Sequence, residues 1–211
     1  MHGYWIWATA ALLYAGFRLW YDNWRGKLTP QEIEVFMRTA KENGADKLND
    51  LEIVRQFLKA DDGREFVMVN LVRIPSEPVL HPLTGKSVAP IEMMQHYSQH
   101  FVKLLVRHGG HPALVTRKIG GYVDAWQVPP DPGWSVVGFM RYRSRRDMME
   151  MVTNPGFNDM HQFKVLGVAE TFSFPSQPMI KLFVGPRLWV ALVLALAAAL
   201  VQIVILVHWS F

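Results

Sequence analysis

Cysteine is absent from the 211-residue sequence. A disulfide framework, a thiolate metal site and a cysteine nucleophile are therefore excluded. Charge is also scarce, because only 19% of the residues are Asp, Glu, Lys or Arg and the formal net charge is +4. The basic residues are mixed with acids through the middle of the chain, so this small surplus does not predict binding to nucleic acid.

Hydrophobic residues are abundant instead, at 50% of the sequence, and they gather in two terminal runs. The second run, from Leu188 to Val207, has no charged residue in its twenty positions. As a helix it would be roughly 30 Å long, which matches the hydrocarbon core of a bilayer. Trp189 and Trp209 stand at its two ends, where indoles prefer the headgroup region. We therefore expect a transmembrane helix within residues 181–211.

The first run, from Tyr4 to Tyr21, is shorter and contains Arg18 near one end. An arginine there can extend to the interface, where Trp20 and Trp24 would form an aromatic belt. A cleavable signal peptide would need a basic start and a small-residue cleavage site, and neither is present. We expect a second transmembrane helix within residues 1–25.

The basic residues next to the two runs predict the orientation. Arg18, Arg25 and Lys27 lie at the inner end of the first run, and Lys181 and Arg187 precede the second. The outer ends carry no lysine or arginine. By the positive-inside rule, we expect a two-pass protein of a bacterial inner membrane, with both termini outside and the middle domain in the cytoplasm.

Small residues form a stripe along the second run. Ala191, Ala195, Ala198 and Gln202 follow one another at steps of four, three and four, which places them on one helix face. Small residues allow close helix packing in lipid, and a glutamine there needs an interhelical hydrogen bond. A weaker stripe of Ala8, Ala11 and Ala15 lies on the first run. We expect the Ala/Gln stripe to face protein, although alanine is also common in lipid-facing positions.

The middle of the chain predicts a helical pair at 26–62 and an α+β domain at 63–180. Thr29-Pro30-Gln31-Glu32 has the pattern of a capping box, and Asp61-Asp62-Gly63 ends the second helix. The later segments alternate in the order β-α-β-β-α-β, which is the ferredoxin-like arrangement. They are a strand at Glu65–Ile74, a helix at Pro90–Arg107, an interrupted strand from Ala113 to Gln127, a strand at Trp134–Tyr142, an interrupted helix after Ser144 and a strand at Thr171–Phe174.

Residues 64–175 resemble the dimeric α/β-barrel superfamily. The resemblance rests on VMVNLVR, on HYSQH followed by HGG, and above all on YRSRRDMMEMVTNPGF. The chain is most similar to a group of small bacterial proteins known only as a domain of unknown function. It departs from that group at Arg143, where a proline is usual, and at Phe157, where a tyrosine is usual. The superfamily includes monooxygenases, isomerases and haem enzymes, so the resemblance implies a fold rather than one reaction.

The first and third strands of this domain are apolar on both faces. Phe66 and Met68 alternate with Val67 and Val69, and the strand from Trp134 to Tyr142 has the same character. Strands of this kind are buried on both faces, whereas the predicted helices cover only one. We expect the open face to be covered either by a second copy of the domain, as in the superfamily, or by the helical pair.

Six polar or aromatic residues could line a small-molecule cleft in this fold: Asn70, Tyr97, His108, Trp126, Arg141 and His161. No nucleophile–base pair or paired carboxylates accompany them, so a structural role for Asn70 and Arg141 is the stronger interpretation. His96 and His100 have the four-residue spacing of metal ligands. They are expected on a solvated helix face without a third ligand, so we predict no metal site and no cofactor. Arg141, Arg143, Arg145 and Arg146 form a basic cluster that could face anionic headgroups.

These observations lead to one functional prediction and two alternatives. The main prediction is a non-catalytic accessory subunit of a larger inner-membrane complex of photosynthetic or respiratory type. Its expected partners are other integral membrane subunits, the lipid bilayer and, through the open sheet face, a second copy of itself. The first alternative is a membrane-tethered α/β-barrel enzyme, of monooxygenase or isomerase type, for a small lipophilic substrate. The other is a homodimeric ligand-binding module.

Overall fold

The structure is a computed structural model that describes residues 3–180 and 184–208. The chain divides into two compact units, one from the described parts of Met1–Trp24 and Pro178–Phe211 and one from Arg25–Gln177. We call them the terminal unit and the central unit. Lys181 and Trp209, which contributed to the expected membrane topology, lie outside the described residues.

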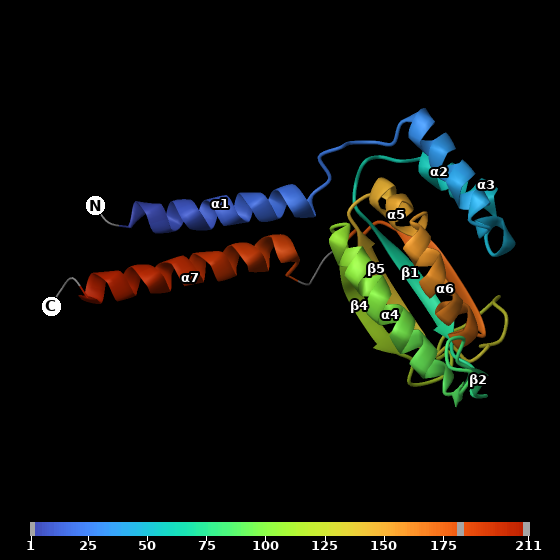
Figure 1. Cartoon of the computed structure of the whole chain (residues 1–211). Coiled ribbons are helices and arrows are strands. Elements are labelled where there is room, and N and C mark those ends of the chain that lie inside the picture. The colour runs from blue at the N-terminus through green and yellow to red at the C-terminus, as the bar shows by residue number, and fades with distance from the viewer. Residues whose placement is uncertain (1–2, 181–183, 209–211) are drawn as a thin grey trace. The chain divides into compact units, whose positions relative to one another are not determined.

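A four-stranded antiparallel sheet forms one layer of the central unit. Its strand order is β4-β5-β1-β6. The strands are β1 (Phe66–Arg73), β4 (His111–Arg117), β5 (Val136–Tyr142) and β6 (Glu170–Ser176). The helices of the other layer are α4 (Pro90–Arg107), α5 (Arg145–Val152) and α6 (Pro155–Gly167). Figure 1 shows these helices on one face of the sheet, so the β-α-β-β-α-β order predicted from the sequence is observed.

The connection between β4 and β5 corrects one prediction. The segment from Tyr122 to Gln127, predicted as the second half of a strand, is a loop. Gly120-Gly121 interrupts the strand pattern, and three prolines between 129 and 132 lack the N–H that a ladder needs. The loop is closed by an ion pair between Lys118 and Asp131 and by a 2.9 Å hydrogen bond from Trp134 Nε1 to the Tyr122 hydroxyl. A short hairpin of β2 (Val79–Leu80) and β3 (Ser87–Val88), absent from the sequence analysis, precedes α4.

The helical pair consists of α2 (Pro30–Glu42) and α3 (Leu51–Lys59), joined by the 3₁₀ turn η1 (Ala45–Lys47). The expected capping box is present, because the Thr29 hydroxyl accepts from the Glu32 N–H and the Glu32 carboxylate accepts from the Thr29 N–H. Asp50 caps α3 in the same way, accepting from the Glu52 N–H at 2.8 Å. Leu58 and Met37 join the core that α4 and α5 form. The pair therefore packs beside the helical layer (Figure 1) and leaves the open sheet face uncovered.

The core lies between the sheet and the helices. Phe66 of β1 and Tyr142 of β5 stack there with ring centroids 5.1 Å apart. The buried face of α4 carries Met93, Tyr97, Phe101 and Leu105. Helical spacing alone favours an inward stripe of Met94, Tyr97, Phe101 and Leu104 with Met93 on the side of His96 and His100, so the observed face is rotated slightly from the one expected from the sequence. The reason is the close approach of α6, since a Cβ on Gly167 would lie 2.9 Å from the Pro90 carbonyl oxygen.

The middle of the opposite sheet face is apolar, and the ion pairs Arg141–Glu65 and Arg73–Glu170 lie on the same face nearer its two ends. Val67 and Val69 of β1 point to it, because they alternate with Phe66, which lies in the core. By register, Phe172 and Phe174 of β6 lie beside Leu71 and Val69 on this face. Both phenylalanines are 47% exposed. Among the described residues of the central unit, no helix packs on this face.

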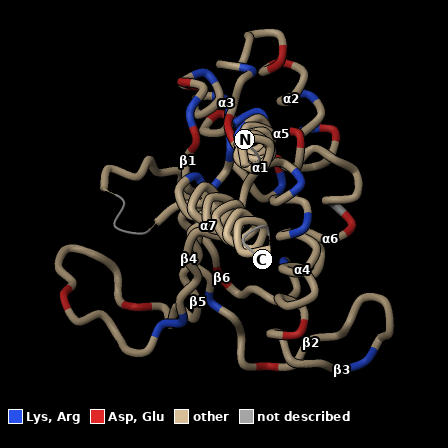
Figure 2. The backbone as a smooth tube through the Cα atoms, turned by 90° about the vertical axis from the view of Figure 1, so that its left-hand side faces the viewer, with Lys and Arg blue, Asp and Glu red and all other residues tan. Residues whose placement is uncertain are grey.

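The terminal unit is a pair of helices, α1 (Tyr4–Tyr21) and α7 (Pro186–His208). Among the described residues, α7 is the helix long and apolar enough to cross a membrane. Figure 2 shows the turns of α7 nearest the viewer without charged residues, and Arg187 in its first turn is the only Asp, Glu, Lys or Arg of this helix. The α1 composition does not reach the same criterion, because Arg18 and the many Trp and Tyr residues lower its mean hydropathy. The composition of α1 therefore does not support the expected N-terminal transmembrane helix.

Candidate functional site

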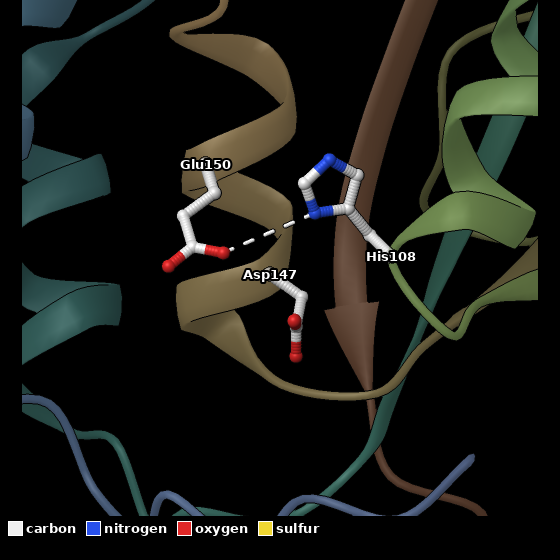
Figure 3. Close-up of side chains that lie close together, drawn as sticks. All are labelled: His108, Asp147 and Glu150. Atoms are coloured by element: carbon white, nitrogen blue, oxygen red, sulfur yellow. Dashed lines mark ion pairs between the residues drawn. The ribbon is translucent and has the colours of Figure 1, made fainter. Parts of the chain in front are cut away.

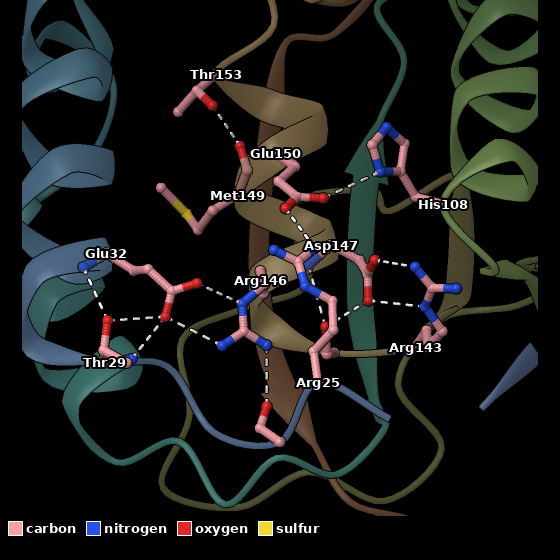
Figure 4. A network of polar contacts seen from close by, with 12 residues as sticks. Arg25, Thr29, Glu32, His108, Arg143, Arg146, Asp147, Met149, Glu150 and Thr153 are labelled. Carbon is pink, nitrogen blue, oxygen red and sulfur yellow. Dashed lines mark hydrogen bonds and ion pairs between the residues drawn. The ribbon is translucent and has the colours of Figure 1, made fainter. Parts of the chain in front are cut away.

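The densest polar arrangement surrounds the first turn of α5. Ser144 caps the helix, because its hydroxyl oxygen accepts from the Asp147 N–H at 3.1 Å. Asp147 is 2% exposed. Its carboxylate accepts hydrogen bonds from the Ser144 hydroxyl and from the Arg143 guanidinium. This carboxylate raises the pKa of Arg143. Figure 4 shows Arg143 and Asp147 facing each other across the turn.

Arg146 links α5 to the chain segment that leads into α2. Its guanidinium donates to Glu32 Oε1 at 2.7 Å (Figure 4). It also donates to the Gly26 carbonyl at 3.0 Å and to the Lys27 carbonyl at 2.7 Å. The hydrogen bonds from Arg146 are the main reason that the pKa of Glu32 falls to about 2. Arg146 is 3% exposed, so it is an internal cross-link rather than a surface charge.

His108, Asp147 and Glu150 offer three possible metal ligands within 4.8 Å of one another. Figure 3 shows the three side chains converging, with His108 Nδ1 3.9 Å from Glu150 Oε2. Both carboxylates, however, already have cationic partners, since Arg143 binds Asp147 and Arg25 donates to Glu150 at 2.6 Å. A divalent cation would have to displace or repel these guanidinium groups. The arrangement therefore favours an ion-pair network over a metal centre.

Asn70 and Arg141 are engaged with protein groups. Asn70 Nδ2 donates to the Met68 carbonyl at 3.0 Å and to the Gly138 carbonyl at 3.3 Å, and its Oδ1 accepts from Ser173 at 2.7 Å. Arg141 is 5% exposed and donates to Glu65 Oε2 from Nη2 at 2.7 Å and from Nε at 3.1 Å. These contacts fit the structural interpretation of the two side chains.

The six cleft candidates do not converge on one point. Trp126 is 76% exposed in the loop between β4 and β5. His108 lies beside Glu150 of α5, and Arg141 pairs with Glu65, which precedes β1. Tyr97 and His161 do come together, with ring centroids 6.5 Å apart.

Lys164 joins Tyr97 and His161 and was missed in the sequence analysis. Its ammonium group lies 5.9 Å from the centroid of the Tyr97 ring. Burial lowers the pKa of Lys164, and burial followed by the charge of Lys164 lowers the pKa of His161. The sequence held a signal, because Phe157, His161 and Lys164 fall at helical spacing on one side of α6.

His96 and His100 are half-buried, so the expected solvated face is wrong. The His96 ring lies 4.2 Å from the Phe163 ring and 4.8 Å from the His100 ring, between centroids. His81, from the β2–β3 connection, lies 6.4 Å from His96. Burial, with smaller contributions from His100 and His81, lowers the pKa of His96.

The basic cluster at the end of β5 is also internal. Besides the pairs of Arg141, Arg143 and Arg146, the Arg145 guanidinium lies 4.4 Å from the Phe57 ring and donates to the Phe57 carbonyl. These four arginines therefore hold the domain together, and they do not form a free surface for anionic headgroups.

In the terminal unit, the Ala/Gln stripe lies on the less exposed side of α7. Ala198 is 4% exposed, and Trp7 Nε1 of α1 donates to Gln202 Oε1 at 2.5 Å. At the other end, Arg187 Nε donates to Asp22 Oδ1 at 2.7 Å. The two helices are therefore antiparallel and pair along most of their length. The stripe of Ala8, Ala11 and Ala15 is exposed, and α1 uses Ile6, Tyr14 and Tyr21 instead.

Comparisons with known proteins support the fold. No protein-family model matches the chain, and no curated protein sequence does. The crystal structure of RPA0582, a protein of unknown function from Rhodopseudomonas palustris, is similar over 63% of this chain and 96% of that chain, with 20% sequence identity and a TM-score of 0.52. The structure of methylated RPA0582 is similar over 64% of this chain and 96% of that chain, with 20% sequence identity and a TM-score of 0.53. The shared fold is α/β barrel-like.

A third similar structure is SnoaB, a cofactor-independent oxygenase from Streptomyces nogalater. It has 15% identity and covers 56% of this chain and 96% of its own, with a TM-score of 0.34. That score is too low to support an argument about this protein. The comparisons thus establish the fold and no activity.

Proposed function

We propose that the chain is a membrane-anchored, non-catalytic accessory subunit of a larger inner-membrane assembly. In this proposal α7 crosses the bilayer and α1 crosses beside it. The contacts from Gln202 to Arg187 run along about 22 Å of helix at 1.5 Å per residue. A bilayer that surrounds α7 would therefore surround α1 as well. Arg18, Asp22 and Arg187 meet at one end, which the positive-inside rule assigns to the cytoplasm.

The observation that carries the structural role is the pairing of the buried charges in the central unit. Arg141 binds Glu65, Arg143 binds Asp147 and Arg146 binds Glu32, and each pair joins different secondary-structure elements or caps a helix. Acids and bases held in this way are unsuited to proton transfer, because their partners keep them ionised. The pair of Arg146 and Glu32 also explains how the helical pair is fixed to α5.

The partner surface in this proposal is the open sheet face. The Ala/Gln stripe is already packed against α1, so it does not require another subunit. The open face presents Phe172 and Phe174 beside valines, and such apolar area favours association. We propose that a second copy of the central unit covers it, because an apolar sheet is complementary to its own copy related by a two-fold axis.

The mass of the purified full-length protein in mild detergent tests this proposal, together with mass spectrometry of co-purifying chains. We expect at least a dimer, and we expect Phe174→Asp to reduce it to the monomer. Ile53→Asp, at a residue of α3 that is 65% exposed, is the matched control and should leave the mass unchanged. A monomeric wild type without other subunits would contradict both the dimer and the accessory role.

The alternative is a membrane-tethered α/β-barrel enzyme of monooxygenase or isomerase type acting on a small lipophilic substrate. The grouping of Tyr97, His161 and Lys164 favours it, because a desolvated lysine is a common catalytic base or nucleophile. Loss of a measured turnover in Lys164→Met, with the dimer intact, would favour the enzyme over the accessory subunit.

A further inference from the structure

Three histidines meet at the edge of the helical layer. His96 and His100 lie on α4, and their ring centroids are 4.8 Å apart. His81, from the connection between β2 and β3, lies 6.4 Å from the His96 ring. The Phe163 ring of α6 packs against His81 at 5.7 Å and against His96 at 4.2 Å. All three histidines are half-buried, so an ion in solution can reach them without opening the core. We call these three residues the histidine cluster.

The pair on α4 has the separation that a shared metal ion requires. Two imidazoles bound to one zinc ion at about 2.0–2.1 Å have ring centroids roughly 5 Å apart. His100 is also in the suitable tautomer, because its Nδ1 lies 3.0 Å from the His96 carbonyl oxygen and can only donate to it. A proton on Nδ1 leaves the lone pair of Nε2 for a metal, which is the usual arrangement of histidine ligands.

The Nε2 atoms of the histidine cluster have no protein partner among the described residues. Burial, followed by the charges of His100 and His81, lowers the pKa of His96, so this ring is neutral at pH 7 and can bind a cation. The acidic group beside His108 differs, because guanidinium groups occupy both of its carboxylates. Of these two groups, the histidine cluster is therefore the one that can accept a metal ion without displacing a protein cation.

His81 needs a small movement to become a third ligand. Its Nδ1 accepts from the Leu83 N–H at 3.2 Å, so the proton of the neutral ring lies on Nε2. Rotation about the Cβ–Cγ bond, a broad torsion in histidine, would replace this hydrogen bond by one to water, because Leu83 is exposed. A shift of about 1 Å toward His96 would then give the separation of two rings on one ion.

We propose that the histidine cluster binds one divalent transition-metal ion, represented here by zinc, with His96 and His100 as primary ligands and His81 as the third. Water completes the tetrahedral shell. Imidazole ligands without a carboxylate favour Zn²⁺, Ni²⁺ or Cu²⁺ over Mg²⁺ and Ca²⁺. The sequence predicted no metal here because a solvated helix face and no third ligand were expected, but the α4 pair is half-buried and His81 lies close by. The ion fastens the β2–β3 hairpin to α4. This inference does not depend on the accessory role, since binding requires neither turnover nor a dimer.

Calorimetric titration of the untagged full-length protein in detergent with ZnCl₂ tests the proposal. We expect one equivalent of Zn²⁺ to bind, and MgCl₂ to give no heat of binding. His96→Gln and His100→Gln should each weaken zinc binding at least about tenfold, since losing even an outer-shell partner of a zinc ligand costs about 10–100-fold. His108→Gln, in the acidic group, is the matched control and should bind zinc like the wild type. No zinc binding by the wild type, unchanged binding in both α4 variants, or loss of binding in His108→Gln alone would overturn the proposal.

Hydrogen exchange tests the third ligand. With zinc at roughly ten times its Kd, amide exchange in residues 79–88 should become about tenfold slower, because local opening of the hairpin must then release the ion. His81→Gln should remove this protection and weaken zinc binding. This variant changes a surface connection, so it decides the question if the α4 variants do not fold. A wild-type hairpin that exchanges at the same rate with and without bound zinc would show that His81 is not a ligand, and the three-histidine site would be wrong.

Discussion

Replacing Arg146 by alanine should destabilise the central unit more than any change to an exposed arginine. The side chain donates to both Glu32 oxygens, at 2.7 and 3.1 Å, and to two backbone carbonyls. Removing one partner of a buried ion pair costs about 3–5 kcal/mol. The Glu32 side chain is 31% exposed, so water replaces part of the lost interaction. We therefore expect a loss of about 2–3 kcal/mol.

Chemical unfolding of the full-length protein, followed by far-UV circular dichroism, measures this loss. Arg38→Ala, at an exposed position of α2, is the matched control. Arg146→Lys keeps the charge but cannot reach all acceptors at once, so its cost should lie between those of the two variants. Hydrogen exchange should also become faster in residues 26–33 of Arg146→Ala. If the free energies of unfolding of Arg146→Ala and Arg38→Ala differ by less than about 0.5 kcal/mol, the cross-link contributes no net stability and the reasoning fails.

Three further predictions concern the other polar groups. In the terminal unit, the hydrogen bond between Trp7 and Gln202 can be tested by a double-mutant cycle of Trp7→Phe and Gln202→Leu, with separation of the two helices in SDS as the measurement. We expect a coupling free energy of about 0.5–1.5 kcal/mol, and additive effects would contradict the hydrogen bond. The pKa of His96 lies below its ordinary value of 6.5, so the unfolded chain binds this proton more readily. The melting temperature should fall as the pH decreases through about 6.5, and His96→Gln should weaken that fall. Lys164→Met should leave the melting temperature unchanged or raise it, because it removes a desolvated charge, whereas a lower value would show that the lysine stabilises the fold.

Local signals in the sequence predicted most of the elements. The capping box at Thr29 and the cap at Ser144 are determined by neighbouring residues, so their patterns could be read directly. The order of strands and helices followed from changes in hydrophobic period. The prediction of a strand from Tyr122 to Gln127 was wrong, because alternation of apolar and polar residues alone does not show whether a partner strand is within reach.

The candidate site was less predictable, because it depends on contacts between distant segments. The partner of Arg146 is Glu32, which lies more than a hundred residues earlier in the chain. No local pattern shows that a cluster of arginines will be divided among separate carboxylates. Lys164 was missed for the same reason, since a lysine on an amphipathic helix is ordinarily placed on the solvated side.

The stretch YRSRRD, which carries the most specific part of the family resemblance, lies where the sheet, the helical layer and the helical pair meet. Tyr142 stacks in the core, Ser144 caps α5, and Arg143 binds the Asp147 carboxylate that follows it. The next two arginines extend from the same turn to the helical pair, Arg145 to Phe57 and Arg146 to Glu32. Because every position has a structural partner, the motif is explained by the assembly of the fold. A resemblance based on it therefore predicts architecture well and says little about chemistry, which must be sought at groups that lack such partners, above all Lys164.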